Sequence, residues 1–215
     1  MATFVYQPLA PGQRTIRLIH LQPRTATQKP DQGLAACTIS HVSLDKSPAY
    51  SALSYTWGDA GQKGCILIDG HPLPVTKNLE IALEHLTPET QPLTLWTDAL
   101  CINQDDEVET TEQVRQMKWI YSQATSVITW LGPAADDSDV AMRWIQDCGS
   151  LAQGFGIATK PELRLGQLLE TFESDPSKLP DPGLEEFLKS VYAQLSSGTG
   201  GTIGAALSKL FKRPY

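Results

Sequence analysis

Residues 95–132 constrain the fold more than any other part of the chain, because an apolar run, a polar loop, an amphipathic segment and a second apolar run follow one another there. Residues 93–100 are predicted to be a buried strand. The helix is predicted to open at Thr110 or Thr111, and residues 126–131 form the next strand. A strand, a helix and a strand in this order predict two parallel strands joined by a right-handed crossover.

Two further helices are predicted from the spacing of their apolar residues. Residues 78–86 place four apolar side chains on one face, with Thr76 or Asn78 as the N-terminal cap. Residues 138–148 form another helix that starts beside acidic residues. The helix of the 95–132 segment is predicted to bury Val114, Met117, Ile120, Tyr121 and Ala124.

The first 55 residues are predicted to be rich in strands. Residues 15–21 alternate like a half-buried strand, and residues 34–44 and 52–55 are also strand-like. The Asp69-Gly70 pair lies between two apolar runs and predicts a hairpin over residues 65–75. Two prolines in its second arm predict that this arm is either an edge strand or irregular.

The sequence therefore predicts an α/β fold with a mainly parallel sheet flanked by helices, an N-terminal β-rich extension and a C-terminal helical region. We expect a single domain over residues 1–215, with its core at about 14–148 and a helical, loop-rich extension at 149–215. Within the extension, residues 161–172, 183–195 and 205–211 are predicted to be helical, and residues 196–204 to be a mobile loop.

Composition excludes several classes of function. The net charge of −7 argues against nucleic-acid binding and against docking on anionic membranes. The chain has neither an apolar run of transmembrane length nor a signal-like N-terminus, so a cytoplasmic location is expected. The four cysteines and four histidines are dispersed, which excludes short-spacing zinc signatures and leaves open a site assembled from distant residues. No metal site is predicted, and the thiols are expected to be reduced.

Two polar clusters follow predicted strands. One begins at Ser54 and the other at Asp98. If the two strands are neighbours, their ends share one mouth, where a ligand would meet an indole for stacking and hydroxyl-binding groups. The alternative is that Asp98 and Asn103 satisfy the backbone of a turn, that Asp105 or Asp106 caps the next helix, and that Trp57 is a core residue followed by a turn glycine. The candidate binding residues are Ser54, Tyr55, Trp57, Gly58, Asp98, Asn103 and Gln104.

No catalytic residue is assigned from the sequence. Glu107, Glu109 and Glu112 lie near this mouth, where a carboxylate would stabilise a developing positive charge. Favourable charge at a helix N-terminus is the better explanation. The glycine-rich residues 198–204 lack the Lys-Ser/Thr ending and the preceding strand of a phosphate-binding loop.

Several segments resemble the fungal heterokaryon incompatibility (HET) domain family. The resemblance runs in order from about residue 14 to residue 145. It is carried by residues 16–18 (IRL), 50–58 (YSALSYTWG), 75–79 (VTKNL), 95–104 (LWTDALCINQ), Gln113-Val114 with Met117, Ile120-Tyr121, and 127–132.

This resemblance implies a death effector in fungal nonself recognition that works by self-association or by assembly with other HET or sensor proteins. The family is considered a distant relative of TIR domains, some of which cleave NAD between nicotinamide and ribose. NAD is thus expected as a substrate under that alternative, and no cofactor is required. In a TIR-like fold, residues 52–55, 96–98 and 127–131 correspond to the first three strands.

The chain departs from the family pattern at four places. Ser51 and Thr97 replace an acid and an isoleucine, and Thr110 follows Glu109 where the family favours arginine. The family continues beyond an R-P-W/Y segment into W-V-x-Q-E, whereas this chain stops at Tyr215 and looks truncated. In the TIR analogy that missing segment holds the catalytic glutamate. The sequence therefore favours an assembly module over an NAD glycohydrolase, and a domain without activity is a third alternative.

Overall fold

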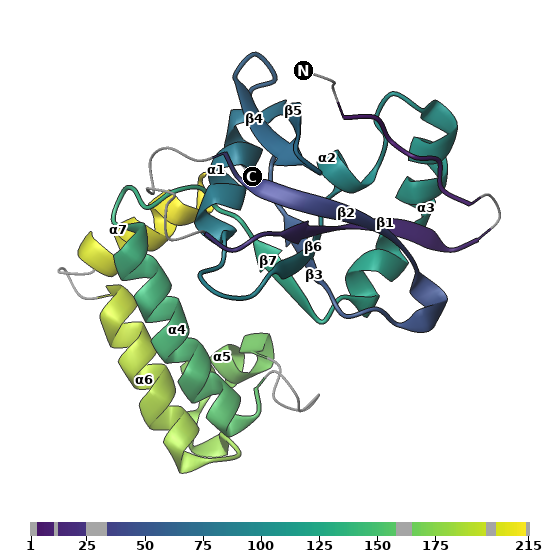
Figure 1. The fold of residues 1–215 in the computed structure, drawn as a ribbon. Coiled ribbons are helices and arrows are strands. Elements are labelled where there is room, and N and C mark those ends of the chain that lie inside the picture. Colours follow the sequence, from purple (N-terminus) through teal and green to yellow (C-terminus); the bar gives the residue numbers. More distant parts are fainter. Residues whose placement is uncertain (1–3, 11–12, 25–33, 158–164, 197–200, 214–215) are drawn as a thin grey trace. The chain divides into compact units, whose positions relative to one another are not determined.

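A computed structural model describes residues 4–10, 13–24, 34–157, 165–196 and 201–213 (Figure 1). The chain divides into two compact units, Met1–Pro133 with Pro214–Tyr215, and Ala134–Arg213. The helix predicted at 138–148, which we expected within the core, belongs to the second unit.

The described part of the first unit contains one mixed sheet. Its strands are β1 (Thr15–Leu21), β2 (Ala36–Ser43), β3 (Ser51–Ser54), β4 (Lys63–Ile68), β5 (His71–Thr76), β6 (Leu93–Trp96) and β7 (Ser126–Thr129). Its helices are η1 (Leu44–Lys46), α1 (Lys77–Leu86), α2 (Asp98–Cys101) and α3 (Glu107–Gln123). The strand order is β5-β4-β2-β1-β6-β3-β7.

The prediction of a mainly parallel sheet is wrong. β3 runs parallel to β6 and β7, and β2 runs parallel to β4, but β1 is antiparallel to both β2 and β6, and β4 is antiparallel to β5. Helical crossovers connect β5 to β6 and β6 to β7, and such connections permit parallel strands. The N-terminal strands lack helical crossovers, so the pattern of residues 95–132 does not extend to them.

The hairpin prediction is confirmed. β4 and β5 pair in register around Asp69 and Gly70, whose φ angles are 51° and 78°. Two successive positive φ angles give a tight turn whose twist matches that of the flanking strands. β5, which carries the two prolines, lies at the edge of the sheet, which is one of the two predicted alternatives.

α1 forms as predicted, whereas two neighbouring elements differ. The Thr76 hydroxyl accepts a hydrogen bond from the Leu79 backbone N–H and so caps α1. The predicted strand at 93–100 ends at Trp96, and a short helix follows it. α3 starts at Glu107 rather than at Thr110, because the Asp106 carboxylate caps it by accepting from the backbone N–H groups of Val108 and Glu109.

The apolar stripe predicted for α3 is partly wrong. Val114 is 52% exposed, and Gln113 is buried in its place. The Gln113 side chain donates a hydrogen bond to the Thr15 carbonyl, so α3 contacts β1 here through a polar side chain rather than an apolar one. β1 itself was expected to be half-buried, but six of its seven residues are buried because side chains pack on both of its faces.

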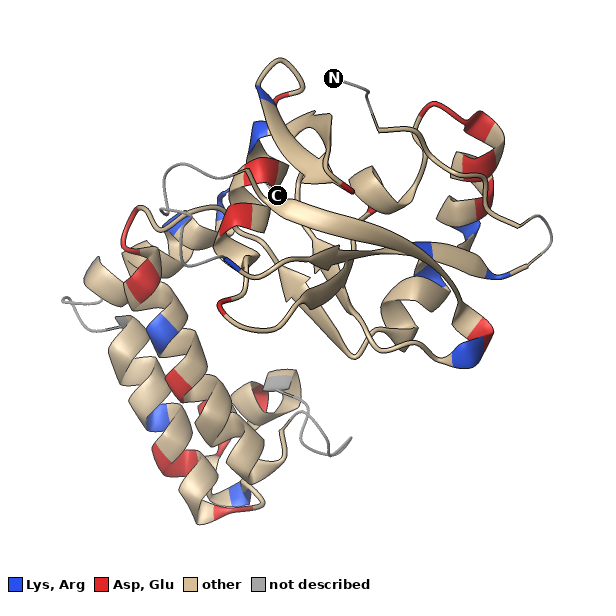
Figure 2. Ribbon diagram, in the orientation of Figure 1, with Lys and Arg blue, Asp and Glu red and all other residues tan. Residues whose placement is uncertain are grey.

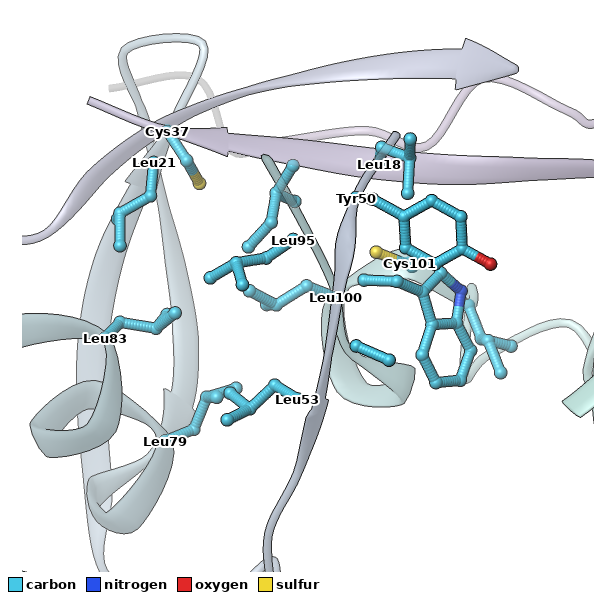
Figure 3. Packing of buried hydrophobic residues seen from close by; sticks show 14 of the residues in the cluster. Leu18, Leu21, Cys37, Tyr50, Leu53, Leu79, Leu83, Leu95, Leu100 and Cys101 are labelled. Atoms are coloured by element: carbon cyan, nitrogen blue, oxygen red, sulfur yellow. The ribbon is translucent and has the colours of Figure 1, made fainter. Parts of the chain in front are cut away.

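The core of the first unit lies between the sheet and its helices. Trp96, Leu53 and Leu79 are among the side chains that are buried completely or almost completely. Figure 3 shows side chains from β1, β3, β6 and α1 gathered in this cluster. The Trp96 ring meets Tyr121 of α3 edge to face at 5.5 Å. These contacts fix the ends of β3 and β6, where the candidate site lies.

The second unit is helical in its described residues. It contains α4 (Ser138–Phe155), α5 (Leu165–Ser174), η2 (Pro176–Lys178), α6 (Pro182–Ser196) and α7 (Gly201–Phe211). α4 is longer than predicted. α7 begins at Gly201, so the predicted mobile loop at 196–204 is wrong for residues 201–204, and residues 197–200 lie outside the described part. Leu168, Leu184 and Leu188 form its small buried cluster.

Candidate functional site

Three parallel strands end at the same edge of the sheet. β3 lies between β6 and β7, with Ser51 opposite Leu95 and Ser54 opposite Thr129. The backbone N–H of Trp130, just after β7, donates to the Ser54 carbonyl at 2.8 Å. The expectation that the two polar clusters follow neighbouring strands is thus confirmed, and the carboxyl ends of such strands are where α/β proteins place ligands.

Trp57 and Asp98 meet at this edge. The indole Nε1 of Trp57 donates a hydrogen bond to Oδ2 of Asp98, with 3.0 Å between the two atoms. Trp57 is 45% exposed, so it is not the core residue that the alternative proposed. The ring is held by its polar end and presents apolar surface to solvent.

Both oxygens of the Asp98 carboxylate accept a hydrogen bond from the protein. Its Oδ1 accepts from the Ala99 backbone N–H at 2.8 Å while Oδ2 accepts from Trp57. The Asp98 carbonyl in turn accepts from Nε2 of Gln104 at 3.0 Å. Asp98 and Gln104 therefore both hold the loop that contains them. The turn-forming alternative predicted this role for Asp98 and not for Gln104.

Asn103 also organises the loop between α2 and α3. Its side-chain oxygen accepts from the Asp105 backbone N–H at 3.3 Å, and its carbonyl accepts from the Asp106 N–H and from the Thr110 hydroxyl. These bonds bring Asp106 into position to cap α3. Binding of a ligand by Asn103 stays a prediction.

Tyr55 and Gly58 have local roles in the segment after β3. Burial of the Tyr55 phenol, followed by the nearby Asp98 carboxylate, raises the pKa of Tyr55. Gly58 has a φ of +73°, and a Cβ there would lie 3.2 Å from the Asn78 Cβ. A residue without a side chain lets this loop approach α1.

Sequence reasoning missed the role of Asn78. Its Nδ2 donates to the Thr56 carbonyl at 2.6 Å, and its Oδ1 accepts from Nε1 of Trp130 at 3.1 Å. One amide thus joins the segment after β3 to the segment after β7. Thr76 caps α1, so the side chain of Asn78 is not needed as a cap. An asparagine in the first turn of a helix that already has a cap is the sequence signal that could have revealed the bridging role of Asn78.

A buried ion pair was also missed. Arg17 is 1% exposed and donates to both carboxylate oxygens of Glu109, at 2.5 and 2.9 Å. Arg17 also donates to the Cys101 carbonyl, and Glu109 accepts from the Asn103 N–H at 2.7 Å. Glu109 is thus neither a free helix-terminal charge nor an acid facing solvent. Glu107 and Glu112 are exposed.

The described residues lack both a cluster of metal-ligating side chains and a helix suited to crossing a membrane. They contain no group of three or more His, Cys, Asp or Glu side chains arranged to hold a metal ion. Nor does any described helix combine the length and apolar character needed to span a bilayer.

Comparison with known proteins identifies the family. The heterokaryon incompatibility protein (HET) family model matches residues 50–171. This chain belongs to the HET family. This chain is also similar to heterokaryon incompatibility protein 6, OR allele, of Neurospora crassa, with 35% identity over 193 residues. The match covers 82% of this chain and 27% of that protein. No solved structure matches the HET chain.

The residues that the family model matches include the strand-end cluster, by which we mean the candidate binding residues Ser54, Tyr55, Trp57, Gly58, Asp98, Asn103 and Gln104. Trp57, Asn78, Asp98 and Glu109 lie within residues 50–171, whereas Arg17 lies before them. The matched segment therefore begins at β3 and contains the acid of the buried ion pair, while its cation comes from the preceding part of the chain. The expected kinship with TIR domains stays a prediction.

Proposed function

We propose that this chain is an incompatibility-type interaction module that acts in fungal nonself recognition and regulated cell death by assembling with copies of itself or with other HET or sensor proteins. Membership of the HET family and the similarity to a heterokaryon incompatibility protein support the biological setting. The chain spans about a quarter of that relative, so the activity of the longer protein is part of the proposal.

The fixed, exposed indole of Trp57 is the observation that carries the assembly mechanism. Asp98 satisfies its N–H, so the ring presents apolar surface in a defined orientation. Tryptophan is enriched among the residues that dominate the binding energy of protein interfaces, and a preorganised side chain loses less entropy when a partner binds. Trp57 is therefore the expected centre of the contact.

NAD cleavage is the less supported mechanism. It requires an acidic or polar group that faces the ribose, and both carboxylate oxygens of Asp98 already accept hydrogen bonds that hold Trp57 and the start of α2 in place. NAD binding by the residues of the strand-end cluster remains a prediction, with Trp57 as the ring that would stack on the nicotinamide or adenine.

Sedimentation velocity over a range of protein concentrations tests the assembly mechanism. We expect reversible self-association that Trp57→Ala weakens by about thirtyfold, the effect of removing an interface residue worth about 2 kcal/mol. Trp119→Ala is the matched control, because Trp119 is 50% exposed on α3 and should leave association unchanged. A monomer at every concentration, or equal effects of the two substitutions, would contradict self-association through Trp57.

The same samples decide between the two mechanisms. Nicotinamide release from NAD is measured for the wild type and for Asp98→Ala. Turnover that Asp98→Ala abolishes would overturn the assembly mechanism in favour of an NAD glycohydrolase.

A further inference from the structure

The second unit contains an apolar groove between α4, α5 and α6. Its volume is about 460 Å³. α4 contributes Trp144, Cys148, Gly149 and Ala152, whose spacing places them on one face of the helix. α6 contributes a parallel stripe between Phe187 and Leu195. The groove is thus bounded by two matching helix faces, each about two turns long.

Apolar side chains of this groove remain in contact with water. Tyr192 is 50% exposed and Leu195 is 41% exposed, although both line the groove. The buried cluster beneath them is small, with Leu168, Leu184 and Leu188 as its fully buried members. Filling the groove would remove this apolar surface from water, so an apolar occupant would be favoured.

Gly149 keeps the wall of the groove open. A Cβ at this position would meet no atom within 4 Å. A glycine inside a helix costs about 1 kcal/mol relative to alanine, and no close approach of a described residue explains it here. The space at Gly149 is therefore available to a bound molecule.

The groove carries one carboxylate, that of Glu173 on α5, among its described lining residues. The two lysines of the η2 and α6 region are already paired, Lys178 with Asp175 and Lys189 with Glu185. No described lysine or arginine forms an ion pair with Glu173. Figure 2 shows the acidic positions on these helices. The charge at the groove thus favours a cationic group.

The size and shape of the groove fit a chain-like small molecule. Its volume of about 460 Å³ lies within the range of small-molecule pockets, and its walls are the two apolar helix faces, each about two turns long. We infer that this groove binds a single-chain amphiphile with a cationic head group, its alkyl chain along α4 and α6 and its ammonium group beside Glu173.

Three probes with the same alkyl chain test this site in the full chain. Dodecylamine, dodecanol and dodecanoic acid are titrated below their aggregation concentrations, and binding is followed by calorimetry at neutral pH. We expect the amine to bind most tightly and the acid most weakly. Equal affinity for the amine and the acid, or no saturable binding of the amine, would overturn the inference.

Glu173→Gln tests the role of the carboxylate. Because Glu173 is exposed, we expect the affinity for the amine to fall by about two- to fivefold and the affinity for the alcohol to stay constant. Glu170→Gln is the control, since Glu170 is on the same helix and is not a lining residue. An equal effect of the two substitutions would assign the preference to general charge rather than to this site, and so contradict it.

Gly149→Leu tests the location. A Cβ at this position would meet no atom within 4 Å, so we expect a leucine to enter the groove and saturable binding of all three probes to be lost. Gly154→Leu is matched to it, because Gly154 is also on α4, also meets no atom within 4 Å, and does not line the groove. Thermal unfolding of both variants checks that the helices form. Binding that survives Gly149→Leu, or a basic amphipathic peptide that binds while none of the three probes does, would refute the site.

Discussion

The guanidinium of Arg17 and the carboxylate of Glu109 form a bidentate ion pair that joins β1 to the first turn of α3. The Tyr6 ring lies over the guanidinium, with 4.9 Å between the ring centre and Cζ. Glu109 also accepts a hydrogen bond from the Asn103 backbone N–H, so this ion pair holds the loop between α2 and α3 in place. The buried charge is therefore linked to the position of Asp98 and its partners.

We expect Arg17→Ala to lower the free energy of unfolding by about 3–5 kcal/mol, because it leaves the Glu109 carboxylate buried without a cation. Urea denaturation followed by tryptophan fluorescence measures the loss. Arg14→Ala is the control, since the Arg14–Asp45 pair is partly exposed and should contribute less than about 1 kcal/mol. Similar losses in the two variants would show that burial of the Arg17 pair has no special importance.

Asn78→Ala removes both bonds that connect the segments after β3 and β7. We expect a loss of about 1–3 kcal/mol and faster amide hydrogen exchange in residues 56–58. Asn78→Asp keeps the acceptor for the Trp130 indole and loses the donor to Thr56, so its effect should be confined to the segment after β3. Unchanged exchange in Asn78→Ala would contradict the bridging role.

Gly64→Ala should destabilise the protein by about 1–3 kcal/mol, the cost of overpacking. The added Cβ would lie 2.8 Å from side-chain atoms of Glu80. Glu80 is buried, accepts from the Cys65 N–H and pairs with Lys77, so it cannot move freely. Thermal unfolding measures the loss. Gly166→Ala on α5 is the control: the added Cβ would meet no atom within 4 Å, so this substitution should be neutral or stabilising.

Stability should fall in alkaline solution. Burial raises the pKa of the Cys37 thiol from 9.0 to about 12. Between these values the unfolded chain has lost a proton that the folded protein retains, so this contribution is complete below pH 9.0 and declines as the pH rises towards about 12. Urea unfolding at increasing pH measures the slope, which Cys37→Ala should reduce. An identical slope in Cys37→Ala would contradict this origin.

Local signals in the sequence predicted local structure well. The Asp69-Gly70 turn, the prolines of β5 and the Thr76 cap of α1 each act within a few residues, and all three were predicted. The sheet order was not, because pairing of β1 with β6 depends on residues more than 70 positions apart.

The candidate site divides in the same way. The proximity of Trp57 and Asp98 followed from two polar segments after two strands. The hydrogen bonds that the Asp98 carboxylate accepts within the protein could not be predicted, because they depend on which donors the folded loop brings near it. The partner of Arg17 lies 92 positions away, and nothing in its own strand indicates Glu109.

The central position of β1 has a consequence for biosynthesis. This strand lies between β2 and β6, so one of its two hydrogen-bonding edges has no partner until residues 93–95 have left the ribosome. During most of the synthesis of the first unit, β1 is therefore an apolar strand with an unpaired edge, and such a strand is prone to aggregate. A truncation that removes residues 15–21 would split the sheet into two halves rather than trim its edge.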